Sequence, residues 1–150
     1  EDIQYQPIVD FATVLIAPAD HPLASKRRDR IKLEEIGRYG LILPPRHLAT
    51  WRMVEAVFQQ HGVAYNVTLE AGGWEVIKKY VETGLGISIV TDICLTGHEK
   101  LVRIPLDRFF AHRTYGVVLR RKKHLLAPAR KFIEMMAPTA AGELGVTSDG

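Results

Sequence analysis

The stretch EAGGWEVIKKYVETGLGISIV, residues 70–90, decides the fold because a loop, a helix, a turn and a strand follow one another without interruption. Apolar side chains recur at helical spacing over 74–83. Gly84 and Gly86 are predicted to end this helix in a left-handed turn and to lead directly into a buried strand over 85–93.

The first glycine pair, Gly72 and Gly73, lies where a predicted strand over 64–71 meets that helix. In open α/β sheets, ligands bind at the carboxyl ends of strands, where helix starts offer unpaired N–H groups. Gly73 could instead serve only as the helix cap. Glu75 already places a negative charge in the first turn, which disfavours phosphate or sulfate there.

A second junction of the same kind surrounds Thr50. A short strand over 41–45 precedes it, and a helix over 50–61 is predicted to follow, closed by Gly62. Thr50 is the expected N-cap residue, or its hydroxyl could face a ligand. Two helix starts after neighbouring parallel strands would face the same cleft.

Strands that alternate with helices across 41–93 predict an α/β fold with parallel strands. Residues 138–150 are small and polar and are expected to form a frayed tail. The remaining predicted elements are strands over 11–18, 100–106 and 113–121 and helices over 32–40 and 126–136.

The composition allows a hydrophobic core and excludes few classes of protein. The chain has 150 residues, 47% of them hydrophobic and 25% charged, with a formal net charge of +3. This length suits one domain or two small lobes, and the charge tolerates an anionic ligand without demanding nucleic acid. The single cysteine, Cys94, points to a reducing compartment, and no apolar run is long enough to span a bilayer.

Motifs for catalysis and metal binding are missing. The six histidines lack the spacing of a metal site, and the sequence has no Gly-x-Ser-x-Gly, Walker or Gly-x-Gly-x-x-Gly motif. We therefore predict no catalytic residues, no metal and no cofactor. The basic clusters at 25–30 and 120–124 contain no interleaved aromatic residues and are interpreted as solvated edges.

Four segments in this order resemble the effector-binding domain of LysR-type transcriptional regulators. They are VLIAPADHPLA (14–24), the unit from LILPP to HGV (41–63), WEVIKKYVETGLGISIV (74–90) and YGVVLRR through FIEMM (115–136). The stretch FFAHRTYGVVLRRKKHLLAPARKFIEMMAP (109–138) is most similar to the branch that controls sulfur assimilation. The resemblance covers about residues 5–137.

The resemblance implies a two-lobed α/β fold of the periplasmic-binding-protein type (type II), here truncated in lobe I. A winged helix-turn-helix that binds DNA, and the first units of lobe I, would lie outside this sequence, and strands 12–17 and 114–120 would cross between the lobes. The implied domains are the end of lobe I with the first crossing strand (1–18), lobe II (19–111), the return strand with a lobe I helix (112–137) and a flexible tail (138–150).

The family's effector contacts map onto Thr50, Gly72, Gly73, Trp74 and, as an aromatic wall, Phe11. The implied ligand is a small anionic metabolite such as sulfate, O-acetylserine or N-acetylserine. The sulfur branch often has a hydroxyl residue where this chain has Gly72, which separates this chain from a direct copy of that site. A cytoplasmic protein, a homodimer or tetramer, and DNA contact through the absent domain are also implied.

Two other functions share this architecture. A solute-binding protein of an ABC transporter would have an export signal and behave as a monomer. An enzyme with the same fold would need a clustered acid, base or nucleophile, and none stands out in the sequence.

Overall fold

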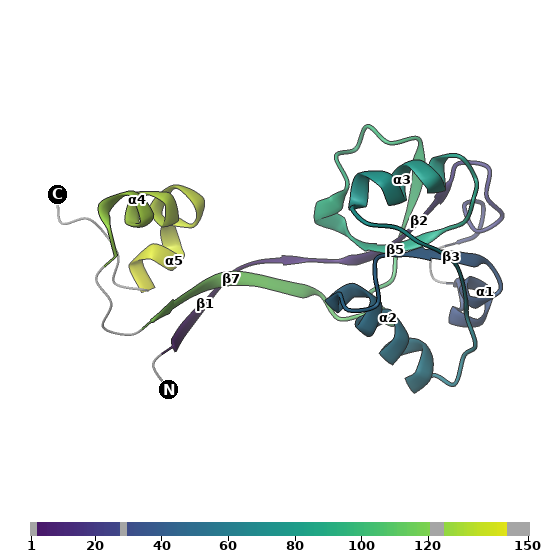
Figure 1. Ribbon diagram of the computed structural model, residues 1–150, viewed down its shortest axis with the longest axis horizontal. Coiled ribbons are helices and arrows are strands. Elements are labelled where there is room, and N and C mark those ends of the chain that lie inside the picture. The colour runs from purple at the N-terminus through teal and green to yellow at the C-terminus, as the bar shows by residue number, and fades with distance from the viewer. Residues whose placement is uncertain (1–2, 28–29, 121–124, 144–150) are drawn as a thin grey trace. The chain divides into compact units, whose positions relative to one another are not determined.

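The computed structural model describes residues 3–27, 30–120 and 125–143, which form two units (Figure 1). One unit comprises residues 12–113, and the other comprises residues 1–11 and 114–150. All site residues except Phe11 lie in the first of these units, which is called the central unit below. Each unit is described by itself.

The central unit contains one mixed sheet. A three-stranded sheet has the order β5-β2-β6, and a two-stranded sheet pairs β3 with β4 in parallel. The two sheets are joined between β3 and β5, where the Ile42 amide donates to the Ile87 carbonyl at 2.8 Å. The strands are β2 (Thr13–Pro18), β3 (Gly40–Leu43), β4 (Asn66–Glu70), β5 (Ser88–Thr91) and β6 (Leu101–Pro105).

Gly86 permits the close approach of β5 to β3. A Cβ atom at this position would lie 2.5 Å from the carbonyl oxygen of Gly40, so any larger residue would push the strands apart. Gly84, two residues earlier, has φ +79° and ends the preceding helix in the left-handed conformation. The predicted left-handed helix end is confirmed at Gly84, whereas the role of Gly86 is the close approach of the strands.

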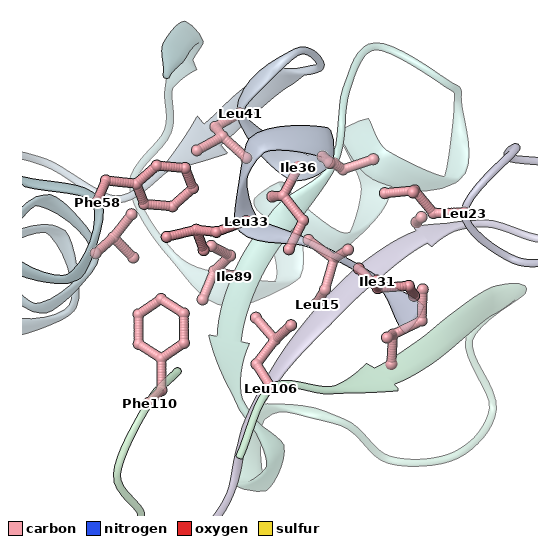
Figure 2. Packing of buried hydrophobic residues seen from close by; sticks show 14 of the residues in the cluster. Leu15, Leu23, Ile31, Leu33, Ile36, Leu41, Phe58, Ile89, Leu106 and Phe110 are labelled. Carbon is pink, nitrogen blue, oxygen red and sulfur yellow. The ribbon is translucent and has the colours of Figure 1, made fainter. Parts of the chain in front are cut away.

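Helices cover both faces of this sheet. The helices α1 (Leu33–Gly37) and α2 (Ala49–Gln60) pack on one face, where Leu15, Phe58 and Ile89 belong to the larger buried cluster (Figure 2). The helix α3 (Trp74–Glu82) covers the other face through Ile77 and Val81. Predicted and observed helices here agree within a few residues, because an apolar stripe faces each side of the sheet.

The other unit is a two-stranded ribbon with two helices. Strand β1 (Ile3–Phe11) pairs with β7 (Arg113–Arg120), and α4 (Ala127–Met136) precedes α5 (Pro138–Glu143). Phe11 packs edge-on against Tyr115 with ring centroids 5.5 Å apart.

Two sequence predictions need correction. The predicted strand over 11–18 is shorter, since β2 begins at Thr13 and Phe11 is the last residue of β1. Strand β2 is the middle strand of the three-stranded sheet, and its assignment to a crossing between lobes stays a prediction. The frayed tail is wrong for 138–143, which form α5, and its remainder at 144–150 lies outside the described residues. None of the helices in the described residues is long and apolar enough to cross a membrane.

Candidate functional site

Four of the five predicted site residues, Thr50, Gly72, Gly73 and Trp74, lie at one edge of the central sheet. Strands β3, β4 and β5 are parallel, so their carboxyl ends at Leu43, Glu70 and Thr91 share this edge. Strand β2 runs the opposite way and begins there at Thr13, directly opposite Thr91. The Ala71 amide donates to the Leu43 carbonyl at 3.0 Å, which ties the loop before α3 to the loop before α2. Both helix starts therefore lie at the same edge.

Thr50 is not the N-cap of α2. The helix begins at Ala49 with Leu48 as its N-cap, and no side chain caps it. Thr50 lies in the first turn, is only 4% exposed, and its Oγ1 accepts a hydrogen bond from Nη1 of Arg113 at 3.0 Å. The hydroxyl is thus held by a cation rather than by the helix backbone.

The start of α2 is electropositive. It has no acidic residue in its first turn, and its first N–H groups have no intrahelical partner. The Arg113 guanidinium adds a full positive charge at Thr50. In the preceding loop, Arg46 lies 3.5 Å from a Glu70 carboxylate oxygen and stacks 4.9 Å above the Trp51 ring. This start can attract an anion.

The start of α3 offers space but less positive charge. Gly73 is its N-cap with φ +88°, and both Gly72 and Gly73 are exposed, with nothing within 4 Å of where a Cβ would stand. Glu75 lies in the first turn and pairs with Lys78 at 2.8 Å. Trp74 packs against the α3 core cluster and is half-buried. The start of α3 therefore has space for a ligand but attracts an anion less strongly than the start of α2 does.

Phe11 belongs to β1 in the other unit, where its ring contacts Tyr115. Sequence reasoning missed Arg113, Thr13 and Thr91. Arg113 reaches Thr50 across 63 residues, and no local pattern signals that contact. Thr13 and Thr91 could have been found from the sequence, because each lies at the end of a predicted strand next to the predicted cleft.

A second polar cluster lies beside α3. Lys78 is 4% exposed and donates to a Glu99 carboxylate oxygen at 2.8 Å. Glu99 also accepts hydrogen bonds from Thr96 and Gly97 in the loop before β6. The Lys78 ammonium and these donors hold the pKa of Glu99 far below its usual range. The cluster fastens this loop to α3.

A half-open cavity of about 390 Å³ adjoins the same loop and is lined by Asp92, Leu95 and Arg103 among others. Asp92 and Arg103 form an ion pair there. None of the predicted site residues lines this cavity. Among the described residues, no group of three or more His, Cys, Asp or Glu could hold a metal ion.

Comparison with known proteins identifies the family. The LysR substrate binding domain model matches residues 1–141. The chain belongs to the LysR substrate binding domain family. Its fold is accordingly the periplasmic-binding-protein-like (type II) α/β fold that the sequence resemblance implied.

Two curated relatives are regulators of Burkholderia cenocepacia. The chain is 32% identical over 139 residues to the HTH-type transcriptional regulator SsuR, which covers 91% of this chain and 44% of SsuR. It is 29% identical over 135 residues to the HTH-type transcriptional regulator CysB, which covers 89% of this chain and 42% of CysB. The chain thus spans less than half the length of these relatives, which are transcriptional regulators and not enzymes.

Among solved structures, the regulatory domain of CcmR from Synechocystis PCC6803, in complex with 2-PG, superposes with a TM-score of 0.81 at 29% identity. The match covers 93% of this chain and 67% of the CcmR chain.

Proposed function

We propose that this chain is part of the ligand-sensing portion of a LysR-type transcriptional regulator and that a small anion binds at the carboxyl edge of its central sheet. The carrying observation is the electropositive start of α2, where Arg113 is hydrogen-bonded to Thr50. The open space at Gly72 and Gly73 on the same edge gives a guest room. Membership of the family favours a regulator over a solute-binding protein of a transporter.

In this proposal the effector acts by population shift. A ligand changes a conformational equilibrium only through its different affinity for the two states, and the affinity for DNA changes with that equilibrium. DNA contact would be made by a part of the regulator outside this sequence, and the protein would work in the cytoplasm. Sulfate, O-acetylserine and N-acetylserine are the proposed effectors because the sequence is most similar to the branch of the family that controls sulfur assimilation. The similarity to CysB and SsuR covers 89% and 91% of this chain.

The test is a thermal melt of the full-length protein with each of these compounds and with 2-PG. A ligand that binds only the folded state raises the melting temperature by mass action, by several degrees at about 100 times its Kd. Because sulfate stabilises proteins generally by exclusion from their surface, a specific response must saturate with concentration. Sodium chloride at equal ionic strength is the control.

A second measurement separates sensing from mere binding. The compound that saturates in the melt should change the affinity of the full-length protein for its promoter DNA in a gel-shift titration. No saturating response to any tested anion would contradict the proposal.

We further propose that the full-length protein is a homodimer or tetramer. Large apolar side chains are exposed on the ribbon unit, among them Ile3 at 61%, Phe132 at 64% and Met135 at 75%. Exposed apolar surface of this kind marks contact with other polypeptide. Sedimentation of the 150-residue chain is expected to show self-association that decreases when Phe132 and Met135 are both replaced by serine.

A further inference from the structure

Thr91, at the end of β5, holds a buried hydroxyl group without a partner. The residue is 1% exposed, and its Oγ1 has no hydrogen-bond partner in the described part of the chain. Buried polar groups in native proteins nearly always have a partner, so an orphaned hydroxyl points to a group that binds there. Its position at the carboxyl edge places it where ligands bind in open α/β sheets.

The alternation of side chains along β5 fixes the face of the sheet on which the Thr91 side chain lies. Ile89 belongs to the buried cluster that packs under α2, whereas Val90 belongs to the cluster that packs under α3. Successive side chains of a strand point to opposite faces, so Thr91 faces the same side as Ile89 and α2.

The neighbours of Thr91 on that face are hydroxyl groups and a cation. Thr13 stands opposite it across the β2–β5 pair and donates to Met53 Sδ at 3.9 Å, one turn along α2 from Thr50. Opposite residues in such a pair have Cβ atoms about 5 Å apart. Thr50 in turn accepts from Arg113. The hydroxyls and the guanidinium thus gather at one end of α2.

Charge around this cluster is one-sided. Among the ion pairs of the described residues, none joins Arg113 to a carboxylate, and the first turn of α2 has no acidic residue. The positive charge of Arg113 also reaches Cys94, just beyond Thr91, where it opposes the rise in the thiol pKa that burial causes. Within the described residues the guanidinium thus has no carboxylate at ion-pair distance, and its positive charge acts on the end of β5.

We propose that Arg113 and Thr91 recognise the effector's oxyanion group together, which makes them the specificity-determining residues of this site. The ligand is a small compound with a carboxylate, sulfate or phosphate group. One oxygen of this group accepts a hydrogen bond from the Arg113 guanidinium, whose own bond to Thr50 then breaks. A second oxygen accepts a hydrogen bond from the Thr91 hydroxyl. This inference rests on the proposed function and adds two residues that no sequence motif singled out.

The test uses the full-length protein, with sulfate, N-acetylserine and 2-PG as separate probes in calorimetric titrations. Thr91→Val keeps the shape of the side chain and removes the hydroxyl. Its melting temperature without ligand is expected to be unchanged or higher, since an unpaired buried group is lost, while its affinity for the binding probe falls about tenfold or more. Thr91→Ser restores the hydroxyl and is expected to regain most of that affinity.

Matched controls separate recognition from general damage. Ser88→Ala removes another buried hydroxyl from the same strand, one that already donates to the Ile42 carbonyl, and affinity is expected to stay unchanged. Arg113→Gln should lower affinity about tenfold to a hundredfold, whereas Arg103→Gln, which removes the same charge from β6, should not. Sulfate and N-acetylserine separate the recognition of a sulfate from that of a carboxylate, and 2-PG, the ligand of the CcmR regulatory domain, is the third probe.

The outcomes separate the two proposals. If the wild-type protein binds a probe and Thr91→Val binds it equally well, the Thr91 hydroxyl serves only an ordered water, and the inference is wrong while the proposed function stands. If Arg113→Gln and Arg103→Gln lose affinity equally, the effect is general electrostatics and the inference is again wrong. If the wild type binds none of the probes, the proposed function fails and the inference fails with it.

Discussion

Arg113 and Thr50 are joined by a 3.0 Å hydrogen bond that spans 63 residues of sequence. It connects the first residue of β7 to the first turn of α2. The Thr50 side chain is buried, so the bond is partly shielded from water. Its location makes it both a structural tie and a part of the proposed anion site.

We predict that Thr50 and Arg113 are energetically coupled. Thr50→Val and Arg113→Gln each remove the bond, and a partly buried hydrogen bond to a charged donor contributes about 1 to 2 kcal/mol. A double-mutant cycle in urea unfolding should give a coupling energy of about 1 kcal/mol. Thr68→Val, an exposed threonine on β4, paired with Arg113→Gln is the control and should be additive. Additivity of the Thr50 pair as well would mean that the bond does not form in solution.

Glu99→Gln is predicted to destabilise the central unit by about 2 to 4 kcal/mol, because it leaves the buried Lys78 ammonium without its buried counter-charge. Lys78 would keep Glu75, whose side chain is 85% exposed and therefore compensates weakly. Lys79→Gln breaks the exposed pair with Glu82 on the same helix and should cost about 0.5 kcal/mol or less. Equal losses of unfolding free energy for the two variants in urea would show that the Lys78–Glu99 pair stabilises the protein no more than the exposed Lys79–Glu82 pair does.

The same pair predicts a pH dependence. The pKa of Glu99 is lowered from its ordinary value of 4.5 in the folded state, so its contribution to stability is complete above that value and is lost as the pH falls below it. Unfolding free energies measured from pH 6 to pH 3 should therefore fall more steeply for the wild type than for Glu99→Gln. Parallel curves would show that Glu99 titrates normally in the folded chain.

Sequence reasoning located the βαβ elements between 41 and 93 well, because each buries an apolar stripe against a sheet and is bounded by glycine or proline. It missed β1, whose apolar residues are interrupted by Pro7 and are exposed or half-buried along the whole strand. It also misjudged the cap of α2, since capping preference is a weak prior that the Arg113 contact overrides.

The candidate site divides in the same way. Gly72 and Gly73 could be placed at a strand-to-helix junction from local pattern alone. The Arg113 cation and the unpaired Thr91 hydroxyl could not be placed in this way. Long-range strand pairing and a contact across 63 residues bring them to the end of α2, and no local pattern signals that pairing or that contact.

The glycines on either side of α3 should respond differently to the same substitution. Gly86→Ala would place a Cβ 2.5 Å from the Gly40 carbonyl oxygen and should cost about 1 to 3 kcal/mol or more. Gly72→Ala meets nothing within 4 Å and should be neutral or stabilising by up to about 1 kcal/mol. Thermal melts of both variants test this, and a loss of stability at Gly72 as large as that at Gly86 would mean that the space in front of α3 is filled in solution.

Cys94 provides a reporter for the charge at Arg113. Burial raises the pKa of this thiol, and the positive charges of Lys78 and Arg113 oppose that rise. Arg113→Gln removes one of these charges, so the thiol pKa should move still higher and less thiolate should be present at pH 8. Cys94 is the only cysteine of the chain, so its reaction with iodoacetamide can be followed directly.

The rate must be measured across a range of pH, because the substitution could also loosen the structure and expose the thiol. The midpoint of the profile reports the pKa, and the plateau at high pH reports exposure. Arg103→Gln is the control, with an unchanged midpoint. An anion that neutralises Arg113 should move the wild-type midpoint upward as the substitution does, since both reduce the same positive charge. An unchanged midpoint in Arg113→Gln would show that the guanidinium charge does not act on the end of β5. That result would contradict the arrangement on which the proposed site depends.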